Sequence, residues 1–170
     1  RRMNEMRYRK LSVLLAPALF VSTLGGCSNT PKADMMMHCT YEQTIDAMTY
    51  TSSADFTYVG ETGQMLTGEI THQYEGYPKD EASNTVLTDM AVRASALSET
   101  DGVSIELNRT DTGFGSEETW DYTKIDIEEI PYVDELQGEF IDKNRGYYSQ
   151  DMAKDYYEGQ NYGCSVSDIH

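Results

Sequence analysis

Methionine and histidine side chains gather close to the start of the first expected strand, where they could bind a soft metal ion. Residues 35–39 read Met-Met-Met-His-Cys, and the last residue of the chain is His170. Thioether and imidazole groups suit copper(I), so Met36, His38 and His170 form a candidate copper site. A flexible tether that leads into the first strand is the simpler interpretation, because three consecutive methionines cannot all face one ion.

Acidic side chains offer oxygen ligands for calcium, the second metal to consider. Residues 142–146 read Asp-Lys-Asn-Arg-Gly and begin like a calcium-binding loop. An EF-hand needs a bidentate glutamate at the end of that loop, and Ala153 stands there instead. Loose binding of calcium by acidic loops is therefore the alternative, and a solvated acidic surface is the simpler interpretation.

The sequence gives little support for an enzyme. No Gly-x-Ser-x-Gly motif accompanies the three histidines, so a serine nucleophile is not indicated. His72 alternates with Ile70 and Tyr74, which is typical of a histidine packed in a sheet. Residues 113–115 (Gly-Phe-Gly) are followed by Ser-Glu-Glu, and acid at that position repels phosphate. We therefore expect a non-catalytic protein without a cofactor.

A short export signal precedes Cys27. Residues 7–10 are mostly basic, residues 11–24 are almost entirely apolar, and two glycines lead into the cysteine. That order is typical of a signal peptide. The 14 residues of the apolar run fall short of the roughly 20 that cross a membrane. Leu-Gly-Gly-Cys at 24–27 resembles the lipobox of bacterial lipoproteins.

The lipobox resemblance implies a location and a division of the chain. In that family the cysteine becomes the first mature residue and carries a lipid, so we expect Cys27 to anchor the protein in a bacterial cell membrane. The folded part then faces outside the cytoplasm. Residues 1–26 are the expected signal peptide, residues 27–38 the lipidated cysteine with a flexible tether, and residues 39–170 a single domain.

The charge of the chain excludes nucleic acid as a partner. The net charge is −16 over 170 residues, and it becomes −20 from Cys27 onward because five of the 13 basic residues and one acid precede that cysteine. No basic patch interrupts this acidic sequence, so phosphate backbones are repelled.

Cys39 and Cys164 are left as a pair once Cys27 carries the lipid. Outside the cytoplasm, an even pair of cysteines usually forms a disulfide. We expect this bond to join the start of the folded domain to its end. In the chain-entropy model, closing so long a loop stabilises a protein by up to about 5 kcal/mol.

Tyrosines near the end of the chain could form a binding surface. The candidates are Tyr147, Tyr148 and Tyr162. Tyrosine combines rigid contact area with a polar tip, which suits a glycan or an envelope protein as partner. The alternative, and the commoner outcome, is that the neighbouring Tyr156 and Tyr157 pack a helix onto the sheet.

The spacing of apolar residues predicts an α+β fold. Alternation over residues 39–77 predicts a meander of three strands with a turn at 60–63. The expected elements that follow are a helix capped by Asp80 or Ser83 and ended at 101–102, strands at 103–107 and 120–127 joined by a loop at 110–116, a short helix at 149–159, and a last strand or strap at 164–169. The result is an antiparallel sheet of about five strands packed against one main helix, with a short C-terminal helix.

The most specific motif of the folded part is residues 120–127, Trp-Asp-Tyr-Thr-Lys-Ile-Asp-Ile, followed by a break at Pro131. Together with the lipobox, the opening meander and the central helix, this motif is similar to the YehR-like family of small bacterial lipoproteins. The function of that family is not established, so the resemblance implies no catalytic residues. We predict a lipid-anchored, extracytoplasmic, non-catalytic module that binds an unidentified ligand or partner in the cell envelope. A metal-binding envelope protein is the alternative.

Overall fold

The computed structural model of the chain describes residues 30–129 and 137–170. The expected signal peptide, Cys27 and the break at Pro131 lie outside these residues. In the described part, none of the helices is long and apolar enough to cross a membrane.

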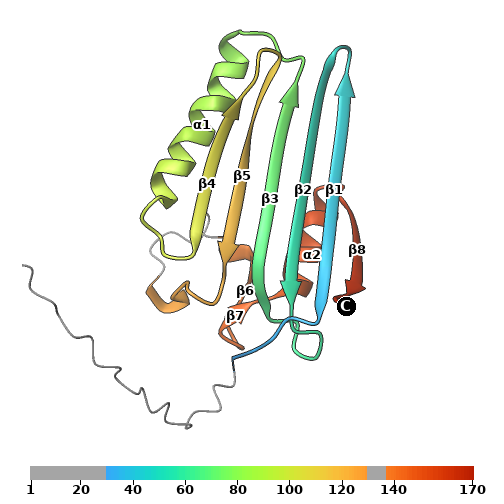
Figure 1. The fold of residues 1–170 in the computed structure, drawn as a ribbon, viewed down its shortest axis with the longest axis vertical. Helices are drawn as coiled ribbons and strands as arrows, with labels where there is room; N and C mark the ends of the chain where they lie inside the picture. The colour runs from blue at the N-terminus through green and yellow to red at the C-terminus, as the bar shows by residue number, and fades with distance from the viewer. Residues whose placement is uncertain (1–29, 130–136) are drawn as a thin grey trace, which may run out of the picture.

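A six-stranded antiparallel sheet forms the body of the domain (Figure 1). Its spatial order is β4-β5-β3-β2-β1-β8. The strands are β1 (Met35–Ile45), β2 (Met48–Tyr58), β3 (Met65–Glu75), β4 (Val103–Arg109), β5 (Gly113–Asp121) and β8 (Gly163–Asp168). The predicted three-strand meander is confirmed, since β1 pairs with β2 and β2 with β3.

Two helices cover one face of this sheet, which we call the inner face. α1 (Glu81–Leu97) begins where predicted, because the Asp80 carboxylate accepts a hydrogen bond from the backbone N–H of Ser83 at 2.9 Å. α2 (Gln150–Gly159) follows Ser149, also as predicted. α1 lies along the β4 edge and α2 lies behind β1 and β2 (Figure 1).

Short elements connect α2 to the strands before it. They are the 3-10 turns η1 (Ile127–Glu129) and η2 (Gly138–Phe140) and the two-stranded hairpin of β6 (Ile141–Asp142) and β7 (Tyr147–Tyr148). The fold is thus α+β, as predicted, with one more strand in the main sheet than expected and this small hairpin besides.

The sheet begins earlier in the chain than the sequence indicates. β1 starts at Met35, four residues before the predicted domain boundary, because it pairs with both β2 and β8 from that residue onward. Met36 and His38 therefore belong to a strand and not to a flexible tether. β8 accounts for the additional strand, so the tail is an edge strand and not an unpaired strap.

The region before the Trp120 motif also differs from its prediction. Gly113 and Gly115 lie in β5, although glycine-rich sequence favours a loop. A Cβ atom on these residues would lie 2.1 Å and 2.2 Å from the carbonyl oxygens of Tyr74 and His72 on β3. Glycine is thus the residue that lets the two strands approach here. At the far end, β5 stops at Asp121, and residues 125–127 lead into η1 instead of forming a strand.

The core lies between the inner face and α2. Strand residues that point inward alternate with polar residues on the outer face, and Met37, Phe56 and Trp120 are fully buried. The ring of Tyr157, from α2, packs 5.7 Å from that of Phe56. Burying such apolar area contributes about 25 cal/mol per Å² to folding, which attaches α2 firmly to the sheet.

The predicted disulfide joins Cys39 and Cys164, which face each other across β1 and β8. Cys39 is fully buried on the inner face. The bond holds the last strand of the chain against the first one, at a sequence separation of 125 residues.

Candidate functional site

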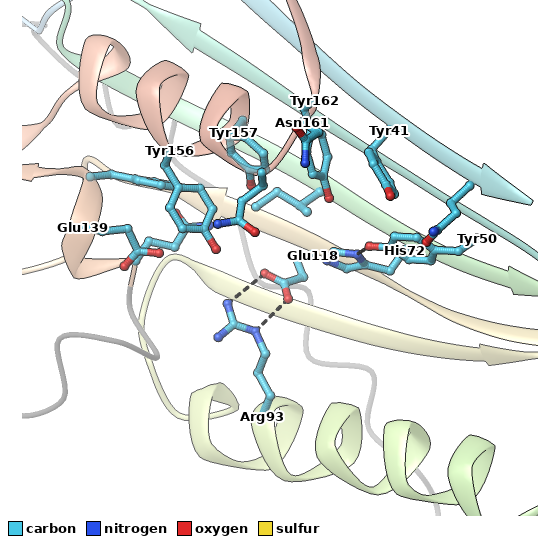
Figure 2. A pocket seen from close by; sticks show the side chains of 15 residues that line it. Tyr41, Tyr50, His72, Arg93, Glu118, Glu139, Tyr156, Tyr157, Asn161 and Tyr162 are labelled. Carbon is cyan, nitrogen blue, oxygen red and sulfur yellow. Dashed lines mark hydrogen bonds and ion pairs between the residues drawn. The ribbon is translucent and has the colours of Figure 1, made fainter.

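A pocket of about 640 Å³ opens on the inner face between α1 and α2 (Figure 2). Strands β1, β2, β3 and β5 form its floor, while Arg93 from α1 and Tyr156 from α2 stand at its sides. We call this space the inner-face pocket. Its volume lies within the range of small-molecule sites in proteins, about 300–1,000 Å³.

Five tyrosines line one wall of the inner-face pocket in an unbroken series, which we call the tyrosine row. In order they are Tyr156, Tyr157, Tyr162, Tyr41 and Tyr50. The distances between successive ring centroids are 5.3, 4.9, 5.4 and 5.9 Å. Aromatic pairs at such distances stabilise one another, so the wall is rigid before any ligand arrives.

An ion pair between the half-buried Arg93 and the buried Glu118 lines the pocket (Figure 2). The Arg93 guanidinium donates to both Glu118 oxygens, from Nε at 2.9 Å and from a terminal nitrogen at 3.2 Å. The indole N–H of Trp120 donates to Glu118 at 3.0 Å. Burial lowers the pKa of Arg93, but the hydrogen-bonded Glu118 carboxylate outweighs it and raises that pKa above its usual value. The charge of Arg93 is thus already neutralised.

His72 lies at the β3 side of the pocket. Its Nδ1 shares a hydrogen bond of 2.8 Å with the Tyr50 hydroxyl, and the two rings stack at 6.1 Å. Burial lowers the pKa of His72, an effect that Arg93 adds to and Glu118 opposes. The imidazole is therefore neutral at neutral pH and brings no positive charge to the site.

The remaining wall is polar and acidic. Glu139, from η2, lines the pocket opposite His72 (Figure 2). Among the residues that the structure describes, no basic side chain forms an ion pair with Glu139. The side-chain amides of Gln43, Gln160 and Asn161 offer donors and acceptors at the rim. A neutral ion pair and one additional carboxylate leave the lining with net negative charge.

Of the tyrosines predicted as binding aromatics, only Tyr162 lies in this pocket. Its hydroxyl hydrogen-bonds with the Ser52 hydroxyl at 2.9 Å. Tyr148 is only 1% exposed and packs 4.5 Å from the Tyr122 ring, so it belongs to the core and offers no surface. Tyr147 donates its hydroxyl to the Thr62 carbonyl at 2.7 Å and so fixes the β6–β7 hairpin.

The structure does not bring the predicted copper ligands together. Met36 and His38 point to the outer face, where the imidazole Nδ1 lies 2.6 Å from an oxygen of Asp55. Ser165 pairs with His38 across the strands, and His170 lies five positions farther along an extended chain, about 16 Å away.

The acidic loops likewise form no evident calcium site. Among residues 30–129 and 137–170, no three His, Cys, Asp or Glu side chains gather closely enough to hold a metal ion. In the loop that begins like a calcium site, Asp142 accepts hydrogen bonds from the backbone N–H groups of Asn144 and Arg145 instead.

The pocket does contain a histidine and a carboxylate, the pair that an acid–base enzyme needs. The two oxygens of Glu118 are already engaged by Arg93 and Trp120, and the Tyr50 hydroxyl holds Nδ1 of His72. These partners fix the position of both groups.

A comparison with known families places the chain. The family model described as a domain of unknown function, DUF8824, matches residues 27–170. The chain belongs to this family. The description of DUF8824 assigns no function, and none of the curated proteins matches the chain.

Two solved structures are similar to the DUF8824 chain. An NMR structure of a protein from Streptococcus pneumoniae TIGR4 is 12% identical, with a TM-score of 0.47 over 92% of this chain and 100% of that one. The NMR structure of the E. coli YehR protein is 14% identical, with a TM-score of 0.48 over 82% of this chain and 95% of that one. Both TM-scores are below 0.5, so these likenesses carry no inference about this chain.

Arg93 and Glu118 were not predicted as site residues, although the sequence contains a signal for both. Arg93 lies at helical spacing from Met90 and Leu97, so a basic residue interrupts an apolar stripe. Glu118 alternates with Trp120 on the buried face of its strand. A buried base on one element and a buried acid on another predict an ion pair between them.

Proposed function

We propose that this DUF8824 chain is a lipid-anchored, extracytoplasmic, non-catalytic binding module of the bacterial cell envelope, of the YehR-like type. The observation that carries the proposal is the inner-face pocket with its tyrosine row. A preformed concave site with aromatic walls and a few fixed polar groups is the usual form of a ligand site. The pocket suits a small polar ligand, or an end of an envelope glycan or protein.

The anchor rests on the sequence before the fold. A basic, apolar and small-residue order leads into Cys27, and the DUF8824 match begins at the same residue. The disulfide between Cys39 and Cys164 suits an oxidising compartment outside the cytoplasm. Replacing Cys27 by serine should release the protein from the membrane fraction, whereas a Cys27→Ser protein that stays in that fraction would refute the anchor.

The pocket can be tested by filling it. Gln43 is exposed on β1 and points into the pocket, while its neighbour Thr44 points to the outer face. Gln43→Trp places an indole in the space for a ligand, and Thr44→Trp is the matched control on the same strand. The two proteins and the parent are purified from their native host, denatured, and their released small molecules compared by mass spectrometry.

The expected result is a compound released by the parent and by Thr44→Trp but absent from Gln43→Trp. Equal release from all three proteins, or release of nothing from any of them, contradicts the proposal that the inner-face pocket binds a ligand. Circular dichroism and the melting temperature confirm that both variants are folded.

A further inference from the structure

The chemistry of the inner-face pocket indicates the class of its ligand. The inference rests on the proposed function, because it assumes that this pocket is the binding site. Three properties of the lining bear on the ligand: its aromatic faces, its net charge, and the charge of the molecule around it.

The aromatic faces favour a cation. A tyrosine ring carries negative potential on its face, and a cation within about 6 Å of the ring centroid is attracted to it. The tyrosine row places five such rings along one wall of the pocket, with Tyr156 still 42% exposed. Rings from two or more directions are the usual receptor for an alkylated ammonium group.

The charges in the pocket favour the same class. Among the described residues that line the pocket, Arg93 is the only lysine or arginine, and Glu118 neutralises it. Glu139 then supplies an uncompensated negative charge, since His72 is neutral. Among the described lining residues, an anionic ligand would find no available cation, whereas a cationic ligand would find both a carboxylate and aromatic faces.

The molecule as a whole supports this selection. Its net charge is −16, so the surrounding field concentrates cations and depletes anions near the pocket. A neutral sugar would gain nothing from that field. We propose that the inner-face pocket binds an organic cation that carries an alkylated ammonium group, held between the tyrosine row and Glu139.

Choline and its uncharged analogue, 3,3-dimethylbutan-1-ol, provide the direct test, because they share one shape and differ in charge. Each is titrated by calorimetry into the full-length protein in a nonionic polyoxyethylene detergent. We expect choline to bind at least about tenfold more tightly than the alcohol, which cannot make cation–π contacts. Equal affinities, or no binding of choline at millimolar concentration, would overturn the inference.

Two charge variants refine the assignment. Glu139→Gln removes the free carboxylate from the pocket, and Glu106→Gln makes the same change on the outer face of β4. We expect Glu139→Gln to weaken choline binding by about threefold or more, and Glu106→Gln to leave it within error. An equal effect of both variants would place the cation outside this pocket.

The result is separable from the proposed function. If choline does not bind but Gln43→Trp still loses a natural compound that Thr44→Trp retains, the pocket is a ligand site and only the ligand class is wrong. If choline does not bind and no compound is lost, both statements fail.

Discussion

At the scale of single residues, Glu118 decides how the inner face is built. Among the described residues it is the only charged side chain that is buried. Removing a carboxylate from water is costly unless it is paired and hydrogen-bonded. Arg93 and Trp120 supply that pairing, and Arg93 also lies 6.0 Å from the centre of the Trp120 ring. The ion pair therefore links α1 to β5 beneath the pocket.

Arg93→Met should destabilise the domain, because it leaves the Glu118 carboxylate buried with only the indole N–H as partner. Breaking a buried pair usually costs about 3–5 kcal/mol. Because Arg93 is about one-third exposed, we expect about 2–3 kcal/mol after allowance for solvent screening. Urea unfolding measures the change.

Lys154→Met is the control for that measurement, since it breaks an exposed ion pair with Glu158 on α2. Its unfolding free energy should equal that of the parent. If Arg93→Met were as stable as Lys154→Met, the ion pair beneath the pocket would have no structural role.

His72 should make stability depend on pH in a defined direction. Burial holds its pKa in the folded protein below the usual 6.5, so the unfolded chain binds the proton more readily. Stability is then complete above about pH 6.5 and declines as the pH falls toward the lower folded pKa, by at most about 1.4 kcal/mol per pH unit.

The measurement compares the parent with His72→Gln in urea at several values between pH 7.5 and about pH 5, where other titrations affect both proteins equally. The stability advantage of the parent should shrink as the pH falls. Parallel curves for the two proteins would show that the surroundings of His72, namely Tyr50, Glu118 and Arg93, do not disfavour its charged form.

At the scale of elements, β8 depends on the disulfide. It is an edge strand of six residues, and it positions Asn161 and Tyr162, which precede it, at the rim of the pocket. Short edge strands with one neighbour are held by few contacts. The disulfide between Cys39 and Cys164 compensates for the few contacts by attaching β8 covalently to β1.

Replacing both Cys39 and Cys164 by alanine should lower the unfolding free energy by about 2–5 kcal/mol. It should also loosen Tyr162. Hydrogen exchange at the backbone of β8 should then be faster than exchange in α1. A reducing agent added to the parent should reproduce the loss. Unchanged stability in both experiments would mean that packing alone retains β8.

The elements show how far sequence reasoning extends. Alternation and helical spacing correctly predicted β2, β3, α1 and α2, because each buries one side against the same core. The start of β1 was missed, and the segment at 164–169 was left open between an edge strand and a strap. Both depend on a pairing of distant segments that no local pattern records. The glycines of β5 were predicted as part of a loop for a related reason. They allow β5 to pack closely against β3, a distant segment of the chain.

The candidate site was less predictable than the fold. Tyr162 stood out from the sequence because aromatic residues crowd near the chain end. Tyr41, Tyr50 and His72 join it only through the register of three strands. Tyr148 stood out from the sequence for the same reason, but the fold buries it in the core. Composition indicated a surface rich in tyrosine, and tertiary structure decided which rings face the pocket.

At the scale of the whole molecule, the two faces of the sheet differ in chemistry. The outer face carries hydroxyl and acidic residues, such as the Ser53–Thr71 pair, whose hydroxyls lie 2.8 Å apart, and Glu106 and Glu117, which face each other across β4 and β5. The inner face carries the core, the ion pair and the pocket. The outer face is thus acidic and solvated, whereas the inner face holds the pocket on which the proposed binding function rests.

Native mass spectrometry of the protein extracted from its own membrane can test the lipid anchor, the disulfide and the bound ligand in one experiment. We expect a chain that begins at a lipid-bearing Cys27, is lighter by the two hydrogens of a disulfide, and carries a small molecule that Gln43→Trp lacks and Thr44→Trp keeps. A chain that retains residues 1–26 without lipid, or a bound molecule that Gln43→Trp still carries, would contradict this expectation.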